Sequence, residues 1–88
     1  MIEEEIDGQK FSIRDDLTLG EFSKAQDDSM EFDLKSGFPT VKGERLRAKL
    51  IASCVAGMTE EKAGLLPVSV GFKLYVAVQR VNKIPLLA

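Results

Sequence analysis

The stretch that decides the fold runs from residue 2 to residue 22 and reads IEEEIDGQKFSIRDDLTLGEF. Its first half holds two short segments in which apolar and polar side chains alternate, joined by Asp7 and Gly8. An Asp-Gly pair favours the two-residue turn of a β-hairpin, because both turn positions need a positive φ. The pattern therefore predicts a hairpin over residues 2–14, with one apolar and one charged face.

The second half of the stretch predicts the start of a helix over about residues 19–28. Thr18 is followed three residues later by Glu21, which is the capping-box spacing that satisfies two backbone amides at a helix N-terminus. Leu17 and Phe22 stand where a hydrophobic staple has its apolar pair. Since a lone hairpin is marginal in water, we expect the hairpin to pack on helices.

Two longer helices are predicted downstream. Residues 44–56 place apolar side chains, among them Leu46 and Leu50, on one helical face. Residues 70–82 have two interpretations, because their apolar residues alternate as in a strand and also form one face of a helix capped by Ser69. The segment is longer than a typical strand, which favours a helix. Between the two, the sequence TEEKAG predicts a short helical piece.

Residues 29–43 follow neither pattern, and two interpretations stay open. The segment is either a short strand followed by a turn or a mobile loop. Its apolar side chains either form an exposed binding surface or cover the edge of the hairpin. These side chains belong to Met30, Phe32, Leu34, Phe38 and Val41.

Together these elements predict an α+β fold in a single small domain over residues 1–83, with an N-terminal β-hairpin packed on about three α-helices. An apolar tail, residues 84–88, follows; it either folds back on the core or stays exposed. The candidate partner-binding residues are Phe32, Phe38, Ile84, Leu86 and Leu87.

The composition argues against an enzyme. The chain has 88 residues, 12 basic and 14 acidic, and no histidine. Histidine titrates near neutral pH and is the commonest metal ligand, so we expect no catalytic residues, no cofactor and no small-molecule substrate. The net charge of −2 argues against nucleic acid as a partner. The basic residues that do gather in sequence fit a solvated helix face; they are Lys42, Arg45, Arg47 and Lys49.

Metal binding and thiol chemistry are not expected either. The acidic run Glu3–Glu5 could hold a cation only if its side chains converged, whereas strand alternation sends Glu4 to the face opposite its neighbours. Cys54 has no second cysteine to pair with and lies in the apolar stretch LIASCVAG, which favours a buried structural role. The sequence shows no signal peptide and no apolar run of ~20 residues. We therefore expect a cytoplasmic protein without a membrane partner.

The order of these motifs along the chain resembles the order found in a known protein family. An N-terminal pattern of hydrophobic-Asp-Gly-x-x-aromatic-x-hydrophobic is followed by Leu-Thr-hydrophobic-x-Glu, and later by a glycine, a threonine, acidic residues and Leu-Pro. The matching positions are Ile6, Asp7, Gly8, Phe11, Ile13, Leu17, Thr18, Leu19, Glu21, Gly57, Met58, Thr59, Glu61, Leu66 and Pro67. In this order the chain resembles the small tail assembly chaperones and related tail assembly proteins of long-tailed bacteriophages and prophages.

The resemblance implies a non-enzymatic helper in the host cytoplasm. Such a protein self-associates and shields the apolar tape-measure protein until the tail tube polymerises around it. Two other hypotheses stay open. One is a structural subunit of the virion whose hairpin edges pair with neighbouring subunits. The other is a small regulatory protein whose acidic surface binds and inhibits another protein.

Overall fold

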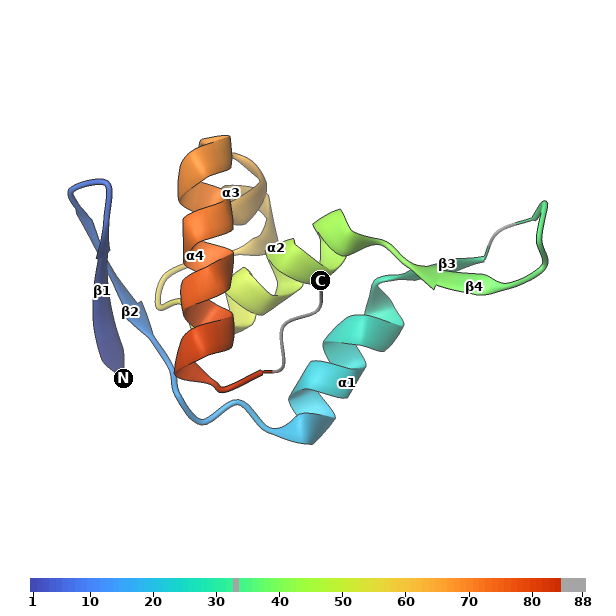
Figure 1. The fold of residues 1–88 in the computed structure, drawn as a ribbon, viewed down its shortest axis with the longest axis horizontal. Helices are drawn as coiled ribbons and strands as arrows, with labels where there is room; N and C mark the ends of the chain where they lie inside the picture. The colour runs from blue at the N-terminus through green and yellow to red at the C-terminus, as the bar shows by residue number, and fades with distance from the viewer. Residues whose placement is uncertain (33, 85–88) are drawn as a thin grey trace.

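The computed structural model describes residues 1–32 and 34–84. The fold is α+β, as expected, with the short helical piece that the sequence predicts at TEEKAG and with a second hairpin. In chain order its elements are β1 (Ile2–Ile6), β2 (Gln9–Ile13), α1 (Leu19–Asp28), β3 (Met30–Phe32), β4 (Pro39–Val41), α2 (Gly43–Cys54), α3 (Glu60–Gly64) and α4 (Val68–Val81). Figure 1 shows the β1–β2 hairpin beside α4 at one end of the molecule and β3 and β4 projecting from the other, along the longest dimension of 44 Å.

The first hairpin forms as its sequence predicts. Strands β1 and β2 are antiparallel, with Ile6 opposite Gln9 next to the turn. Asp7 and Gly8 have φ values of 52° and 82°, the positive angles that this two-residue turn requires. The other edge of β2 is also paired, because Ile13 forms a bridge with Val55 after α2. The hairpin is therefore joined to the end of a helix more than forty residues later in the chain.

That pairing also sets the end of α2. The sequence pattern predicts a helix to residue 56, whereas α2 ends at Cys54. Val55 takes an extended conformation, with φ −100° and ψ 125°, and pairs with Ile13. The amide of Ala56 donates to the carbonyl of Ser12 at 2.9 Å. The last two residues of the predicted helix thus continue the edge of the sheet.

The hydrophobic core lies where the first hairpin, α2 and α4 meet. The hairpin contributes Ile6, Phe11 and Ile13, and α1 adds Ala25 at the margin. The remaining buried apolar residues come from α2, α4 and the residue that follows α2; they are Leu46, Leu50, Ile51, Cys54, Val55, Val70, Leu74, Ala77 and Val78. Segment 68–81 is thus helical, with its predicted apolar face turned inward.

Polar contacts hold the β2–α1 connection against the end of α4. The side chain of Asn82 accepts a hydrogen bond from the amide of Leu17 at 3.1 Å and donates to the carbonyl of Arg14 at 2.9 Å. Arg14 in turn forms a two-pronged ion pair with Glu21, at 2.7 and 3.1 Å. The predicted capping box is complete, since Thr18 and Glu21 each accept from the backbone amide of the other. These contacts fix α1 relative to the core.

Candidate interaction surface

Segment 30–41 carries several exposed apolar side chains among its described residues, and we call it the arm. Met30 lies opposite Val41, and Phe32 lies opposite Pro39. Directly opposed residues of an antiparallel pair project from the same face of the strands. The arm therefore has one apolar face, while Glu31 and Thr40 lie on the other face. This structure corresponds to the strand-and-turn interpretation of the segment, with a second strand that the sequence pattern does not predict.

The arm is fixed at its base. The backbone amide of Lys42 donates to the carbonyl of Ser29 at 2.8 Å, and the fully buried Ser29 hydroxyl donates to the carbonyl of Ala25. Glu31 forms ion pairs with Lys42 at 3.4 Å and with Arg45 at 3.2 Å. The chain thus leaves the body along β3, after α1, and returns along β4 to the start of α2.

Beyond its base the arm extends into solvent. Phe32 is 66% exposed and Phe38 is 70% exposed, and Leu34 is almost fully exposed. Among the described residues, the apolar side chains of the arm neither belong to the core nor pack against it. They therefore do not cover the edge of the first hairpin. An apolar face held out in this way is typical of a surface that binds another protein.

Of the predicted partner-binding residues, Phe32 and Phe38 both belong to the arm, Phe32 at the end of β3 and Phe38 just before β4. Ile84 lies elsewhere, half-buried at the end of α4, where its amide donates to the carbonyl of Gln79 at 2.9 Å. Leu86 and Leu87 lie outside the described residues. The candidate surface is therefore the arm, and Ile84 is not part of it.

A second apolar surface lies between α2, the end of α3 and the start of α4, and we call it the groove. It has a volume of about 310 Å³. Its apolar wall includes Ile51, Leu66, Val68 and Phe72. The guanidinium of Arg47 lies over the ring of Phe72, with Cζ 5.0 Å from the ring centroid, a cation–π contact that holds the ring at the rim.

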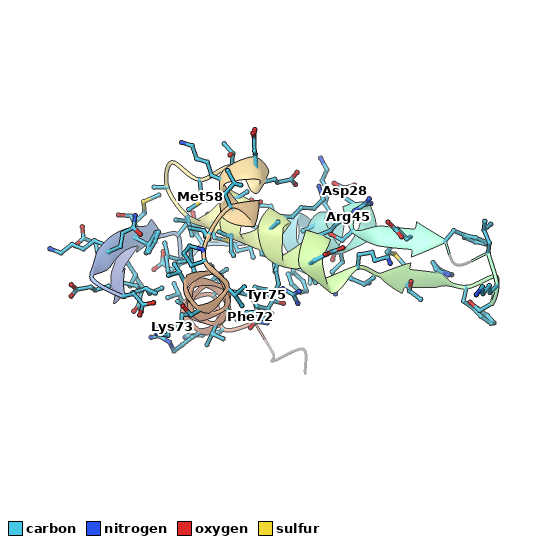
Figure 2. The ribbon with its side chains drawn as sticks, turned by 90° about the horizontal axis from the view of Figure 1, so that it is seen from above. Asp28, Arg45, Met58, Phe72, Lys73 and Tyr75 are labelled. Carbon is cyan, nitrogen blue, oxygen red and sulfur yellow. The ribbon has the colours of Figure 1, made fainter. Side chains whose placement is uncertain are left out.

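The groove follows from a second apolar stripe on α4. Val68, Phe72 and Val76 recur every four residues, and each is at least half exposed, whereas Leu74 on the inner face is fully buried. In Figure 2, Phe72 and Lys73 project from different sides of α4. Lys73 forms an ion pair with Asp7 of the first hairpin at 2.8 Å. In the sequence, this stripe appears as three apolar residues of segment 68–81 that do not belong to its core face.

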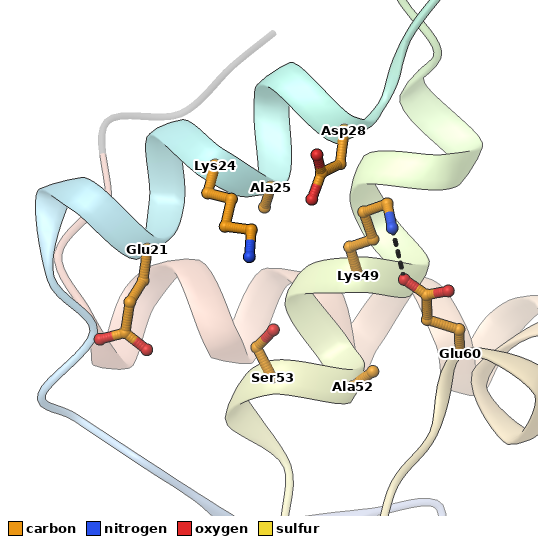
Figure 3. Close-up of a pocket in the computed structure, with 8 residues that line it drawn as sticks. All are labelled: Glu21, Lys24, Ala25, Asp28, Lys49, Ala52, Ser53 and Glu60. Carbon is orange, nitrogen blue, oxygen red and sulfur yellow. Dashed lines mark hydrogen bonds and ion pairs between the residues drawn. The ribbon is translucent and has the colours of Figure 1, made fainter.

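A polar cleft of about 430 Å³ lies between α1 and α2 (Figure 3). Lys49 and Glu60 form an ion pair across one end of it, at 2.7 Å. Hydrogen bonding from Arg14 lowers the pKa of Glu21 at the other end, and the capping contacts with Thr18 lower it further. A general acid at neutral pH needs a raised carboxyl pKa, and the pKa of Glu21 is shifted in the opposite direction. Ser53, which also lines the cleft, has no histidine to activate it.

The remaining chemical candidates are engaged in structural roles. Burial raises the pKa of the Cys54 thiol to about 11, so the thiol stays protonated near neutral pH. Glu4 forms an ion pair with Arg80 of α4.

Within the described residues there is no group of three or more histidine, cysteine or acidic side chains that could hold a metal ion. In the same part of the chain, no helix combines the length and apolar character that crossing a membrane requires.

Comparison with known proteins finds no match for this chain among protein-family models, curated proteins or solved structures. Function is therefore inferred from the arm, the groove and the sequence resemblance.

Proposed function

We propose that this protein is a non-enzymatic assembly protein that self-associates and uses its arm to shield apolar surface of a partner protein. The observation that carries the proposal is the arm, whose strands project at one end of the molecule (Figure 1) and whose side chains of Phe32 and Phe38 are largely exposed. Keeping such side chains exposed is unfavourable for an isolated domain. An apolar surface of this kind suits a protein that binds exposed apolar surface of another chain.

The sequence resemblance supplies the class of partner. In the tail assembly proteins that the chain resembles, the shielded molecule is a tail component such as the tape-measure protein, and the work is done in the host cytoplasm. The arm fits this role physically. It is anchored by Ser29 and Glu31 at its base, so it can present apolar side chains to a long partner while the core of the domain stays intact.

The proposal is tested by co-expressing the chain with the tape-measure protein of the genome that encodes it and measuring how much of that protein stays soluble. We expect the wild-type chain to increase the soluble fraction and to co-purify with it. The double variant Phe32→Ser/Phe38→Ser should lose both effects, because two aromatic anchors of the interface are removed.

A matched control is Leu65→Ser, which removes an equally exposed apolar side chain away from the arm and should behave like wild type. Far-ultraviolet circular dichroism checks that each variant is folded. If the arm variant captures the tape-measure protein as well as wild type does, the arm is not the binding surface. If the wild-type chain captures none, shielding of that protein is not its function.

A further inference from the structure

The C-terminal end of α4 is closed by the residues that follow Asn82. The backbone amide of Lys83 donates to the carbonyl of Arg80 at 3.2 Å, and that of Ile84 donates to the carbonyl of Gln79 at 2.9 Å. These two bonds form the Schellman pattern, in which the chain turns back over the last helical turn. In this pattern the residue after the cap is left-handed, and the next one packs on the third residue from the helix end.

The left-handed position is occupied by an unusual residue. Glycine is the common choice there, whereas this chain has Lys83, with a φ of 54°. A residue with a Cβ atom is strained in that conformation. Asparagine tolerates it better, but Asn82 stands one position earlier and its side chain is bonded to the β2–α1 connection.

The third residue from the helix end, Gln79, is the second departure, because this pattern often has an apolar contact there. Gln79 is 3% exposed, and its Nε2 atom is buried without a hydrogen-bond partner in the described chain. A buried donor without an acceptor costs about as much free energy as one or two hydrogen bonds contribute. Together with the strain at Lys83, this cost offsets the two bonds that close the helix end. The closed and open arrangements therefore have similar free energies.

We propose that Lys83 and Ile84, which we call the strap, exchange between the docked arrangement of this structure and a released one. In the released state Lys83 leaves the left-handed conformation, and water or another acceptor reaches the amide of Gln79. Asn82 is the fixed side of this hinge, because its side chain holds the end of α4 to the β2–α1 connection. Release therefore changes the strap and leaves the core intact.

Release also makes Ile84 available to a partner. Its side chain is half-buried while the strap is docked. A partner that binds the released state more tightly shifts the equilibrium toward that state. We assign this role to the apolar partner of the proposed function, and only this assignment rests on that function. The strap thus regulates how much apolar surface the protein presents.

Hydrogen exchange of the Ile84 amide, followed by NMR on the free protein, measures release, because this amide loses its bond to Gln79 when the strap opens. Lys83→Gly and Lys83→Ala form a matched pair. Both remove the same charge, and only glycine relieves the left-handed strain. We expect the protection of the Ile84 amide to be at least about threefold higher in Lys83→Gly than in Lys83→Ala.

Gln79→Leu tests the second departure. Leucine has a similar size and no amide, so the docked strap then covers an apolar side chain, and the protection of Ile84 should rise at least about fivefold. Gln26→Leu makes the same change in α1 and should leave that protection within about twofold. The amide of Leu74, which is fully buried on α4, reports global unfolding and is the reference in every variant.

Stabilising the docked strap should weaken partner binding. When a partner needs the released state, its apparent affinity falls by the factor by which that state is depleted. In the co-expression assay with the tape-measure protein, Lys83→Gly should therefore capture less than Lys83→Ala does, and Gln79→Leu less than Gln26→Leu. Circular dichroism verifies that each variant is folded.

The outcomes separate the strap from the proposed function. Equal protection of Ile84 within both matched pairs would show an ordinary helix end and overturn the inference. Raised protection with unchanged capture would overturn the link between release and the partner. If the wild-type chain captures no tape-measure protein while Lys83→Gly and Gln79→Leu still raise the protection, the release is supported and the tape-measure protein is removed as the partner.

Discussion

At the residue scale, Asn82 joins parts of the chain that lie far apart in sequence. Its amide oxygen accepts from Leu17, and its amide nitrogen donates to the carbonyls of Arg14 and Val78. All three contacts are partly buried. The side chain of Asn82 thus links the C-terminal end of α4 to the β2–α1 connection. No local sequence pattern indicates this role.

We expect Asn82→Ala to lower the free energy of unfolding by about 1–3 kcal/mol, because backbone groups that it pairs lose their partner in a partly buried site. Urea unfolding followed by circular dichroism measures this. Asn82→Asp keeps the acceptor for Leu17 but places a carboxylate oxygen against the carbonyls of Arg14 and Val78 at the negative end of α4, so it should be at least as destabilising as Asn82→Ala. An alanine variant as stable as wild type would contradict the role of this side chain.

Arg14 gives the stability of the protein a pH dependence. Its guanidinium lowers the pKa of Glu21 and of Asp16 below their ordinary values of 4.5 and 3.8, mainly through side-chain hydrogen bonds. A carboxyl group whose pKa is lower in the folded state stabilises the fold above its unfolded pKa, and this contribution disappears as pH falls through the folded value. Both carboxyl groups are solvent-exposed, so the effect is modest and sensitive to salt.

We therefore expect Arg14→Gln to lose stability relative to wild type at pH 7, and the difference to shrink as pH falls below about 4.5. Urea unfolding of both proteins between pH 7 and pH 2 gives this difference directly. Lys10→Gln, which removes an exposed cation from the first hairpin, serves as the charge-matched control. A constant difference between Arg14→Gln and wild type across the range would show that these ion pairs do not stabilise the fold.

At the element scale, the arm is separable from the body. Met30 and Val41 are paired at its base, and the described apolar side chains beyond them do not join the core. We expect replacement of residues 31–40 by Asn-Gly, a two-residue hairpin turn, to change the free energy of unfolding by no more than about 1 kcal/mol. Partner capture should be lost.

The first hairpin provides the contrast for this deletion. Removing residues 2–13 takes Ile6, Phe11 and Ile13 out of the core, so that variant should not fold. Thermal unfolding of the two deletions, followed by circular dichroism, distinguishes an appended element from an integral one. An unfolded arm-deleted chain would mean that the arm is part of the folding unit.

At the scale of the whole molecule, the parts that follow local rules were predictable from the sequence. Asp7-Gly8 specified the first hairpin, and Thr18 with Glu21 specified the start of α1, because turns and caps depend on neighbouring residues. The apolar periodicity gave the core face of α4 once its length had favoured a helix over a strand.

The remaining features depend on residues that meet only in three dimensions. The end of α2 is set by the pairing of Val55 with Ile13, which no window of the sequence contains. Strand β4 begins at Pro39 and has three residues, too few for alternation to be recognised. The exposed phenylalanines of the arm were identified as candidates, whereas the groove needs three helices together and was not foreseen.

The bond network around Asn82 also bears on the order in which the chain folds. Its hydrogen bonds to Leu17 and Arg14 span 65 and 68 residues, and the core holds side chains from the first hairpin together with those of α4. Contacts of such long sequence separation close large loops and slow the folding of a small domain. During synthesis the N-terminal hairpin therefore has to wait for α4, and the exposed arm emerges from the ribosome well before the core that anchors it is complete.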